Sequence, residues 1–201
     1  MSSSSAAELP PPRTPGAPYR VCLVCLGNIC RSPMAESVLR AALSAVGLDG
    51  AVVVDSAGTG DWHIGDEMDS GARAALAGRG HDGSAHRARQ FQASWLGRRD
   101  LILAMDRRNL ADLRRLARGR DADRIRLFAE VGGLTEASDI PDPWGGNAEE
   151  FGHVLDLLAA AAPVIARRLA RLLEPGTGTE DGAEPGAPGR DGAEPGARGA
   201  R

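Results

Sequence analysis

Short apolar runs alternate with longer stretches of helical periodicity along most of the chain. The runs are rich in aliphatic and β-branched residues, which predicts buried strands over 20–24, 51–55, 100–106 and 124–128. The longer stretches repeat apolar residues every three or four positions, which predicts helices over 32–47, 70–80, 107–118 and 148–173. In the last of these, Pro163 is expected to kink or break the helix.

The alternation of strands and helices predicts the fold class. We expect an α/β protein with three α/β/α layers around a central four-stranded parallel sheet. Ligands of such folds bind at the carboxyl ends of the strands. The loop that joins the first strand to the first helix is therefore the first place to look for a site.

Both ends of the chain lack this patterning. Residues 1–18 are rich in Ser, Ala and Pro, and residues 174–201 are rich in Gly, Pro, Ala and charge, with "DGAEPGA" at 181–187 and again at 191–197. Neither segment offers enough apolar surface to offset the entropy lost on ordering. We expect two disordered tails, the second of them acidic, around one domain at 19–173.

Charge and hydropathy exclude several classes of protein. Residues 174–201 hold six acidic residues and three arginines, so they carry the whole net charge of −3 and the remainder is neutral. A neutral domain does not favour nucleic-acid binding. No apolar run reaches the length of about 18 residues that a membrane span needs, and the start of the chain does not resemble a signal peptide. Three crowded cysteines do not form a disulfide framework, which favours a cytoplasmic location.

The stretch "VCLVCLGNICRSPMAES", residues 21–37, contains the loop at the end of the first strand. The N–H groups of such a loop and of the helix that follows form a nest for an anion. Gly27 supplies backbone freedom, and Asn28 tolerates left-handed geometry. The guanidinium of Arg31 matches two oxygens of a phosphate. We expect Ser32 to cap the helix and Pro33 to occupy its first position.

Cys25 lies at the start of this loop, where the donors that bind phosphate also favour a thiolate. A thiolate beside phosphate can attack phosphorus and form a cysteinyl-phosphate, while the N–H groups and Arg31 stabilise the transition state. A zinc knuckle at Cys22-x-x-Cys25 is a poorer interpretation because a second pair of ligands is lacking. A redox pair is also poorer, because Cys22 lies inside the strand and is expected to pack as a small apolar residue.

Three further residues are candidates for the same site. A cysteine nucleophile expels an oxygen leaving group poorly without a proton donor, and Asp142 is held on a stiff backbone between two prolines. The alternative for Asp142 is an ordinary turn residue. Trp62 and Trp144 are expected to flank the mouth as apolar walls for an aryl phosphate, with core packing as the alternative.

The segment "VCLGNICRSPMAE" resembles the signature loop of the low-molecular-weight protein tyrosine phosphatases. The resemblance extends over about residues 20–173, because further blocks match in order: "DSAGTGDWHIGDEMD" at 55–69, "HRARQF" at 86–91, "LILAMDRRNL" at 101–110 and "DIPDPWGG" at 139–146. It implies hydrolysis of phosphotyrosine in proteins or peptides without a metal or other cofactor.

The resemblance also implies a role for each site residue. Cys25 would be the nucleophile, and Arg31 would bind the phosphoryl group. Ser32 would stabilise the thiolate and help it to leave, and Asp142 would act first as general acid and then as general base. Asn28, Ser32, Ser56 and His86 would hold the shape of the phosphate-binding loop. This loop comprises Cys25, Leu26, Gly27, Asn28, Ile29, Cys30, Arg31 and Ser32.

The chain departs from the family after Asp-Pro, where many members carry two tyrosines and this chain has Trp144 and Gly145. The pocket should be more open on that side, which affects substrate preference. Cys30 stands where the family often has a second cysteine, and a reversible disulfide with Cys25 is a hypothesis.

Four polar residues are expected to take no part in the chemistry. Asp106 ends a strand and is expected to cap the following helix. His63 and His81 are expected to be loop histidines. His153 is expected to be partly exposed on the last helix.

Two other functions remain open. Arsenate reductase uses the same loop, and the versions that rely on an external low-molecular-weight thiol need only one cysteine. Asp142 and Trp62 favour the phosphatase, because arsenate reduction requires neither an acid for an aryl leaving group nor an aromatic wall. A phosphate-binding module without turnover is the third candidate, and the intact set of Cys25, Arg31 and Asp142 argues against it.

Overall fold

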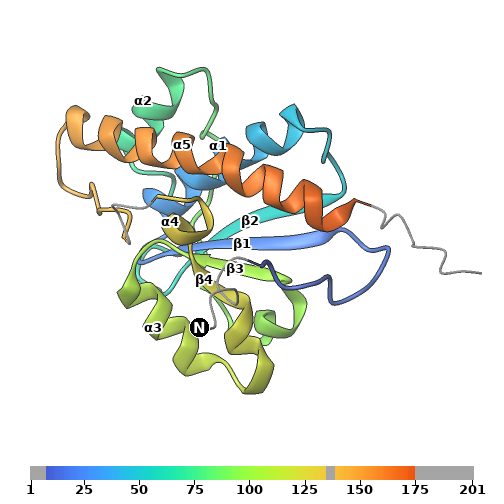
Figure 1. Cartoon of the computed structure of the whole chain (residues 1–201). Helices are drawn as coiled ribbons and strands as arrows, with labels where there is room; N and C mark the ends of the chain where they lie inside the picture. Colours follow the sequence, from blue (N-terminus) through green and yellow to red (C-terminus); the bar gives the residue numbers. More distant parts are fainter. Residues whose placement is uncertain (1–7, 135–138, 175–201) are drawn as a thin grey trace, which may run out of the picture.

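A parallel sheet forms the centre of the computed structural model, which describes residues 8–134 and 139–174. Its strand order is β2-β1-β3-β4, and all three pairings are parallel. Helices cover both faces of the sheet (Figure 1), so the predicted α/β/α architecture with four parallel strands is confirmed. The strands are β1 (Tyr19–Cys25), β2 (Val52–Gly58), β3 (Leu101–Ala104) and β4 (Ile125–Leu127).

The helices are divided between the two faces (Figure 1). One face carries α1 (Arg31–Ala45), α2 (Ser70–Ala77) and α5 (Ala148–Leu173), and the other carries α3 (Arg107–Leu116). Three short elements complete the described part of the chain: α4 (Phe128–Val131) and the 3₁₀ helices η1 (Ala93–Arg98) and η2 (Gly119–Arg124). These three were not predicted, because four to six residues are too few to show a helical period.

Alternation along β1 places its cysteines on opposite faces of the sheet. Leu23 and Cys25 belong to the core beneath α1 and α5, whereas Cys22 and Val24 belong to the core beneath α3. A strand turns successive side chains to opposite faces, so residues three positions apart point away from each other. Cys22 is fully buried as the sequence predicts, and it cannot share a metal or a redox bond with Cys25.

The helix boundaries differ from the expected ones in two ways. Helices α1, α2 and α3 end two or three residues earlier than predicted. Helix α5 does not break at Pro163 but runs without interruption from Ala148 to Leu173. Its buried stripe explains this, because residues on both sides of Pro163, from Phe151 to Leu169, pack into one core.

Residues 9–13 contact the domain, so the expectation of disorder over 1–18 is wrong for this part, whereas residues 14–18 are exposed. Leu9 is 9% exposed, and the Tyr19 hydroxyl donates to the Pro10 carbonyl at 2.8 Å. Residues 1–7 of that predicted tail lie outside the described residues, as does the predicted acidic tail after Glu174.

Arg13 anchors this N-terminal segment. Its backbone N–H donates to Asp100 at 2.6 Å, and its side chain bonds to Asp121 at 2.5 Å and to the carbonyls of Arg99 and Leu96 at 2.8 and 3.0 Å. These bonds link positions more than 80 residues apart in the sequence. The expectation of disorder considered only the lack of apolar surface. It therefore missed the hydrogen bonds and the ion pair by which Arg13 holds the segment in place.

No helix among the described residues combines the length and the apolar character that a membrane crossing would need.

We predict that Arg13→Ala lowers the free energy of unfolding by about 1–2 kcal/mol, because it removes a charged pair and leaves two carbonyls without their donor. Urea denaturation would measure the change. Arg98→Ala is the matched control, because Arg98 is exposed and makes no side-chain hydrogen bond within the described part of the chain. Equal stability of the two variants would contradict the anchoring role.

Candidate active site

The loop between β1 and α1 lies at the carboxyl end of the sheet, as predicted. Strand β1 ends at Cys25, and α1 begins at Arg31 with Cys30 as its N-cap residue. Ser32 is therefore the second helical residue and not the cap, and Pro33 is the third and not the first. Both positions still belong to the first turn, where a backbone N–H has no partner in the helix, so Pro33 causes no loss.

Close packing against residues of the β2 end and of the segment after it fixes the path of the loop. Asn28 adopts the left-handed conformation with φ of 58°. Gly27 has a different role from the expected backbone freedom, because a Cβ atom there would lie 2.9 Å from the His63 ring. Gly58, at the end of β2, lies directly beneath the loop, since a Cβ atom there would lie 2.7 Å from the carbonyl oxygen of Leu26. Any larger residue at Gly58 would push the loop off the sheet.

Asn28 is completely buried and connects the loop to its surroundings. Its amide nitrogen donates to the hydroxyls of Ser32 and Ser56, both at 2.9 Å. Its amide oxygen accepts from the backbone N–H of Arg89 at 2.9 Å, and its carbonyl lies 2.6 Å from His86 Nε2. A carbonyl only accepts, so His86 donates from Nε2. The structure thus brings together all four residues that the resemblance implied for support of the loop.

Cys25 lies at the base of the loop with its sulfur facing donors. The backbone N–H of Asn28 donates to Sγ at 3.2 Å, and Ser32 Oγ lies 3.0 Å from Sγ. Ser32 accepts from Asn28 and lies 3.3 Å from the Ala57 carbonyl. The hydroxyl of Ser32 can therefore donate its one proton to the sulfur, which is nearer than the Ala57 carbonyl. This hydrogen bond is strongest when the sulfur is a thiolate.

Arg31 has an exposed side-chain fraction of only 3% and is held between two carboxylates. Its Nη1 atom donates to Asp106 at 2.6 Å and to the Ile140 carbonyl at 3.2 Å, and Nη2 donates to Asp142 at 2.5 Å. Burial acts to lower the pKa of Arg31, but the negative charges of Cys25, Asp142 and Asp106 outweigh it and raise the pKa. Arg31 is thus a permanent cation beside the sulfur.

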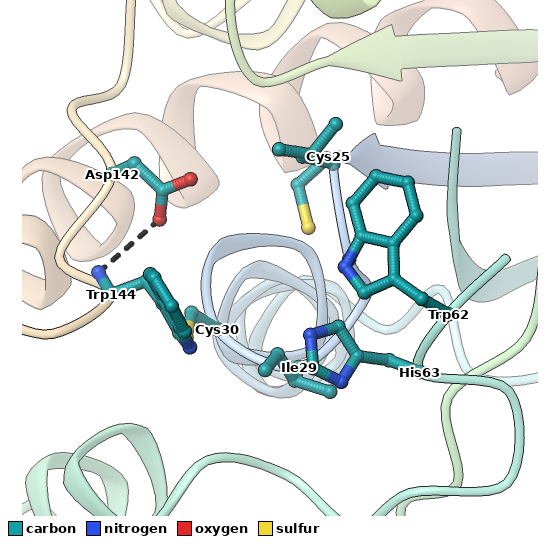
Figure 2. Close-up of a pocket in the computed structure, with 9 residues that line it drawn as sticks. Cys25, Ile29, Cys30, Trp62, His63, Asp142 and Trp144 are labelled. Atoms are coloured by element: carbon teal, nitrogen blue, oxygen red, sulfur yellow. Dashed lines mark hydrogen bonds between the residues drawn. The ribbon is translucent and has the colours of Figure 1, made fainter. Parts of the chain in front are cut away.

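A pocket of about 180 Å³ opens above Cys25 and contains the predicted walls. Figure 2 shows Trp62 on one side of the sulfur and Asp142 with Trp144 on the other. The tryptophans are 62% and 66% exposed, so neither serves the core. The backbone N–H of Trp144 donates to Asp142 at 3.3 Å, which ties the acid to the wall beside it.

Sequence reasoning missed two residues of the site. His63 lines the pocket beside Ile29 (Figure 2), and its Nδ1 lies 2.8 Å from Asp66. Asp106 caps α3 as predicted, by accepting from the Asn109 N–H at 2.7 Å, but its other oxygen also binds Arg31. Its position at the carboxyl end of β3 was a usable signal, because that end of the sheet is where the loop lies.

The other two histidines lie away from the pocket. His81 follows α2, and His153 is exposed on α5.

The placement of the cysteines and the acidic groups bears on metal and redox chemistry. Within residues 8–134 and 139–174, no cluster of three His, Cys, Asp or Glu residues could hold a metal ion. All three cysteines are free. Burial, then the charges of Asp69, Cys25 and Asp142, raises the pKa of Cys30, against the opposing effect of Arg31. Cys30 lines the same pocket as Cys25, and a disulfide between them stays a hypothesis.

Comparison with known proteins shows consistent similarities. Residues 20–174 match the family model described as "Low molecular weight phosphotyrosine protein phosphatase". A low molecular weight protein-tyrosine-phosphatase of Streptomyces coelicolor is 48% identical over 147 residues, which is 72% of this chain and 89% of that protein.

Solved structures agree with the sequence match. A protein tyrosine phosphatase from Entamoeba histolytica superposes with a TM-score of 0.73 at 30% identity, over 76% of this chain and 97% of that one. YfkJ from Bacillus subtilis superposes with a TM-score of 0.72 at 34% identity, over 79% and 98%.

We predict that His86 makes the protein less stable as the pH falls. Burial lowers the pKa of His86, against the smaller opposing effect of its hydrogen bond to Asn28. The unfolded chain therefore binds a proton at higher pH than the folded one does, and stability falls as the pH drops below about 6.5.

The test compares unfolding free energies of the wild type and His86→Gln between pH 7.5 and 5.5, since glutamine keeps an N–H donor but does not titrate. The decline should be steeper in the wild type. Parallel pH profiles would contradict the prediction.

Proposed function

Because the chain belongs to the low molecular weight phosphotyrosine protein phosphatase family, we propose that it hydrolyses phosphotyrosine through a cysteinyl-phosphate on Cys25. The observation that carries this assignment is the shared pocket of Cys25, Asp142, Trp62 and Trp144. A nucleophile, an acid and two aromatic walls together suit an aryl phosphate.

In the first step, the Cys25 thiolate attacks phosphorus, and the S–P bond forms while the P–O bond to tyrosine breaks. Arg31 and the loop N–H groups bind the equatorial oxygens and stabilise their charge. Nη2 of Arg31 bonds to Asp142 at 2.5 Å, so the phosphoryl oxygens of a substrate compete with Asp142 for this guanidinium. Asp142, once released from Arg31, takes up a proton from water and gives it to the leaving phenolate oxygen.

In the second step, water attacks phosphorus and the S–P bond breaks. Asp142, now a carboxylate, takes the proton of the water. Ser32 donates to the departing thiolate from its position 3.0 Å away. The products are inorganic phosphate and the regenerated cysteine.

The wider setting follows from the same assignment. The partners are phosphotyrosine-containing proteins or peptides, and the neutral charge before residue 174 does not favour nucleic acid. A cytoplasmic location is supported by the three free cysteines. The catalytic domain extends from residue 19 to 173, with residues 9–13 packed against it. Arsenate reduction is the weaker alternative, because the matching family model is that of a phosphatase.

We predict that Cys25→Ser abolishes hydrolysis of an aryl phosphate without added metal, because a serine hydroxyl remains protonated beside the loop. Asp142→Asn should lower kcat by about 10² or more, since an amide cannot donate the proton. Turnover of p-nitrophenyl phosphate by both variants and the wild type would measure this.

Three outcomes would count against the proposal. Activity that survives Cys25→Ser would show another nucleophile. Phosphate-competed binding by the wild type without turnover would indicate a binding module. Thiol-dependent reduction of arsenate with negligible phosphatase activity would favour the reductase.

We also predict that Asp106→Asn lowers kcat/KM for aryl phosphate by about tenfold, through Arg31. Asparagine caps a helix as well as aspartate does, so α3 should remain intact. The lost negative charge weakens the hold on Nη1 of Arg31 and lets the guanidinium move off the phosphoryl position.

Asp156→Asn is the matched control, because Asp156 is an exposed carboxylate on α5 that pairs with Arg79. The positioning role also predicts that Asp106→Glu restores part of the activity. Wild-type kinetics of Asp106→Asn would refute it.

A further inference from the structure

A second hollow lies beside the catalytic pocket and has a volume of about 580 Å³. We call it the side groove. It shares Leu26 and Trp62 with the catalytic pocket, so the indole of Trp62 is the wall between the two. Figure 2 shows Trp62 across the sulfur from Asp142, and Asp142 does not line the groove. A substrate that fills the pocket therefore continues over Trp62 into the groove or past Trp144 on the opposite side.

The wall between pocket and groove is well supported. A Cβ atom at Gly60 would lie 2.4 Å from the ring of Trp62, so the indole lies directly on the backbone of Gly60. His63 stands 6.3 Å from the indole between ring centroids. The indole is thus held in place although more than half of it is exposed.

The far wall of the side groove is basic. Arg108 and Arg115 line it from α3, and both are exposed. They stand seven residues apart on one helix, which is about two turns or roughly 10 Å along a single face. Arg115 pairs with Asp112, whereas Arg108 makes no side-chain hydrogen bond or ion pair with any described residue. The wall carries two cations and one anion, and the cation nearer the start of α3 is uncompensated.

The floor and the near side of the groove suit an extended peptide. Phe91 and Leu113 are buried beneath it, and Leu116 is 45% exposed at its edge. Gln90 and Gln92 line it with side-chain amides, which can both donate to and accept from a peptide backbone. Apolar floor, amide groups and guanidinium groups are what a short acidic segment needs to bind.

We propose that the side groove binds acidic residues that flank the phosphotyrosine of the substrate. The inference rests on the phosphatase function proposed above and adds a rule of substrate choice to it. The groove adjoins the pocket at Leu26 and Trp62, so we place the acidic side chains within about three positions of the phosphotyrosine, or roughly 10 Å of extended chain. Charge complementarity favours an acidic segment in the groove. The unpaired guanidinium of Arg108 would repel a basic segment and would gain no partner from an apolar one.

The test uses short phosphotyrosine peptides that carry Glu, Gln, Leu or Lys at the positions within three residues of the phosphotyrosine. For the wild type we expect kcat/KM to be about 3- to 10-fold higher for the Glu peptides than for the Gln peptides. The ratio should shrink as salt rises from about 50 mM to about 500 mM, because the arginines are exposed and screened. Arg108→Gln should lower the Glu-to-Gln ratio, and Arg108→Gln with Arg115→Gln should bring it to about one.

Arg167→Gln is the matched control, because Arg167 is exposed on α5 and lies on the opposite face of the sheet from α3. It should leave the ratio unchanged. A wild-type ratio of one, or a ratio that survives the double variant, would overturn the inference. A preference for the Leu peptides would also overturn it and would assign the groove to apolar side chains.

Two further outcomes distinguish a missing subsite from a missing phosphatase activity. Hydrolysis of p-nitrophenyl phosphate together with indifference to the peptide sequence would remove the side groove as a subsite and leave the phosphatase intact. Absence of any hydrolysis would remove both.

Discussion

The hydrogen bonds of Asn28 are the constraint on which the site depends. A loop of this kind must turn its N–H groups inward, so its own backbone cannot provide the bonds that hold it closed. Asn28 provides them from a fully buried position, reaching β2 through Ser56, helix α1 through Ser32, and the segment at 86–89 through His86 and Arg89. Its left-handed backbone, with φ of 58°, is what turns the side chain under the loop. Removal of this residue would leave several buried partners unsatisfied at once.

The charges around Arg31 form a second, more adjustable layer. The guanidinium is shared by a carboxylate that caps α3, a carboxylate from the loop before α5, and the sulfur of Cys25. Asp106 is fixed by the start of its helix, whereas Asp142 lies on a loop with 40% of its side chain exposed. Asp106 therefore orients the guanidinium of Arg31 permanently, whereas Asp142 can leave it. Such mobility suits a general acid that first approaches the phosphoryl group and then moves away from it.

The sequence predicts the central sheet and the loop after β1 well, and it predicts the N-terminal segment and the walls of the pocket less well. Strands β1 to β4 carry strong apolar runs, and the motif around Cys25 has a fixed relation to the strand before it, so both could be anticipated. The packing of residues 9–13 could not, because it depends on bonds from Arg13 to groups near Asp100 and Asp121, which no local pattern reveals. His63 was missed for a similar reason: its neighbour in space is Gly27, more than 30 residues away in the sequence.

The shared indole of Trp62 has a consequence for how such an enzyme can diversify. One side chain borders both the aryl pocket and the side groove, and it rests on the bare backbone of Gly60. A mutation that moves this ring changes the fit of the phosphorylated residue and of its neighbours together, so the two cannot drift independently during evolution. Arg108 and Arg115 line the side groove but not the catalytic pocket. Substitutions on α3 can therefore change the preference for flanking residues without altering the aryl pocket. A substitution that moves Trp62 alters both the pocket and the groove.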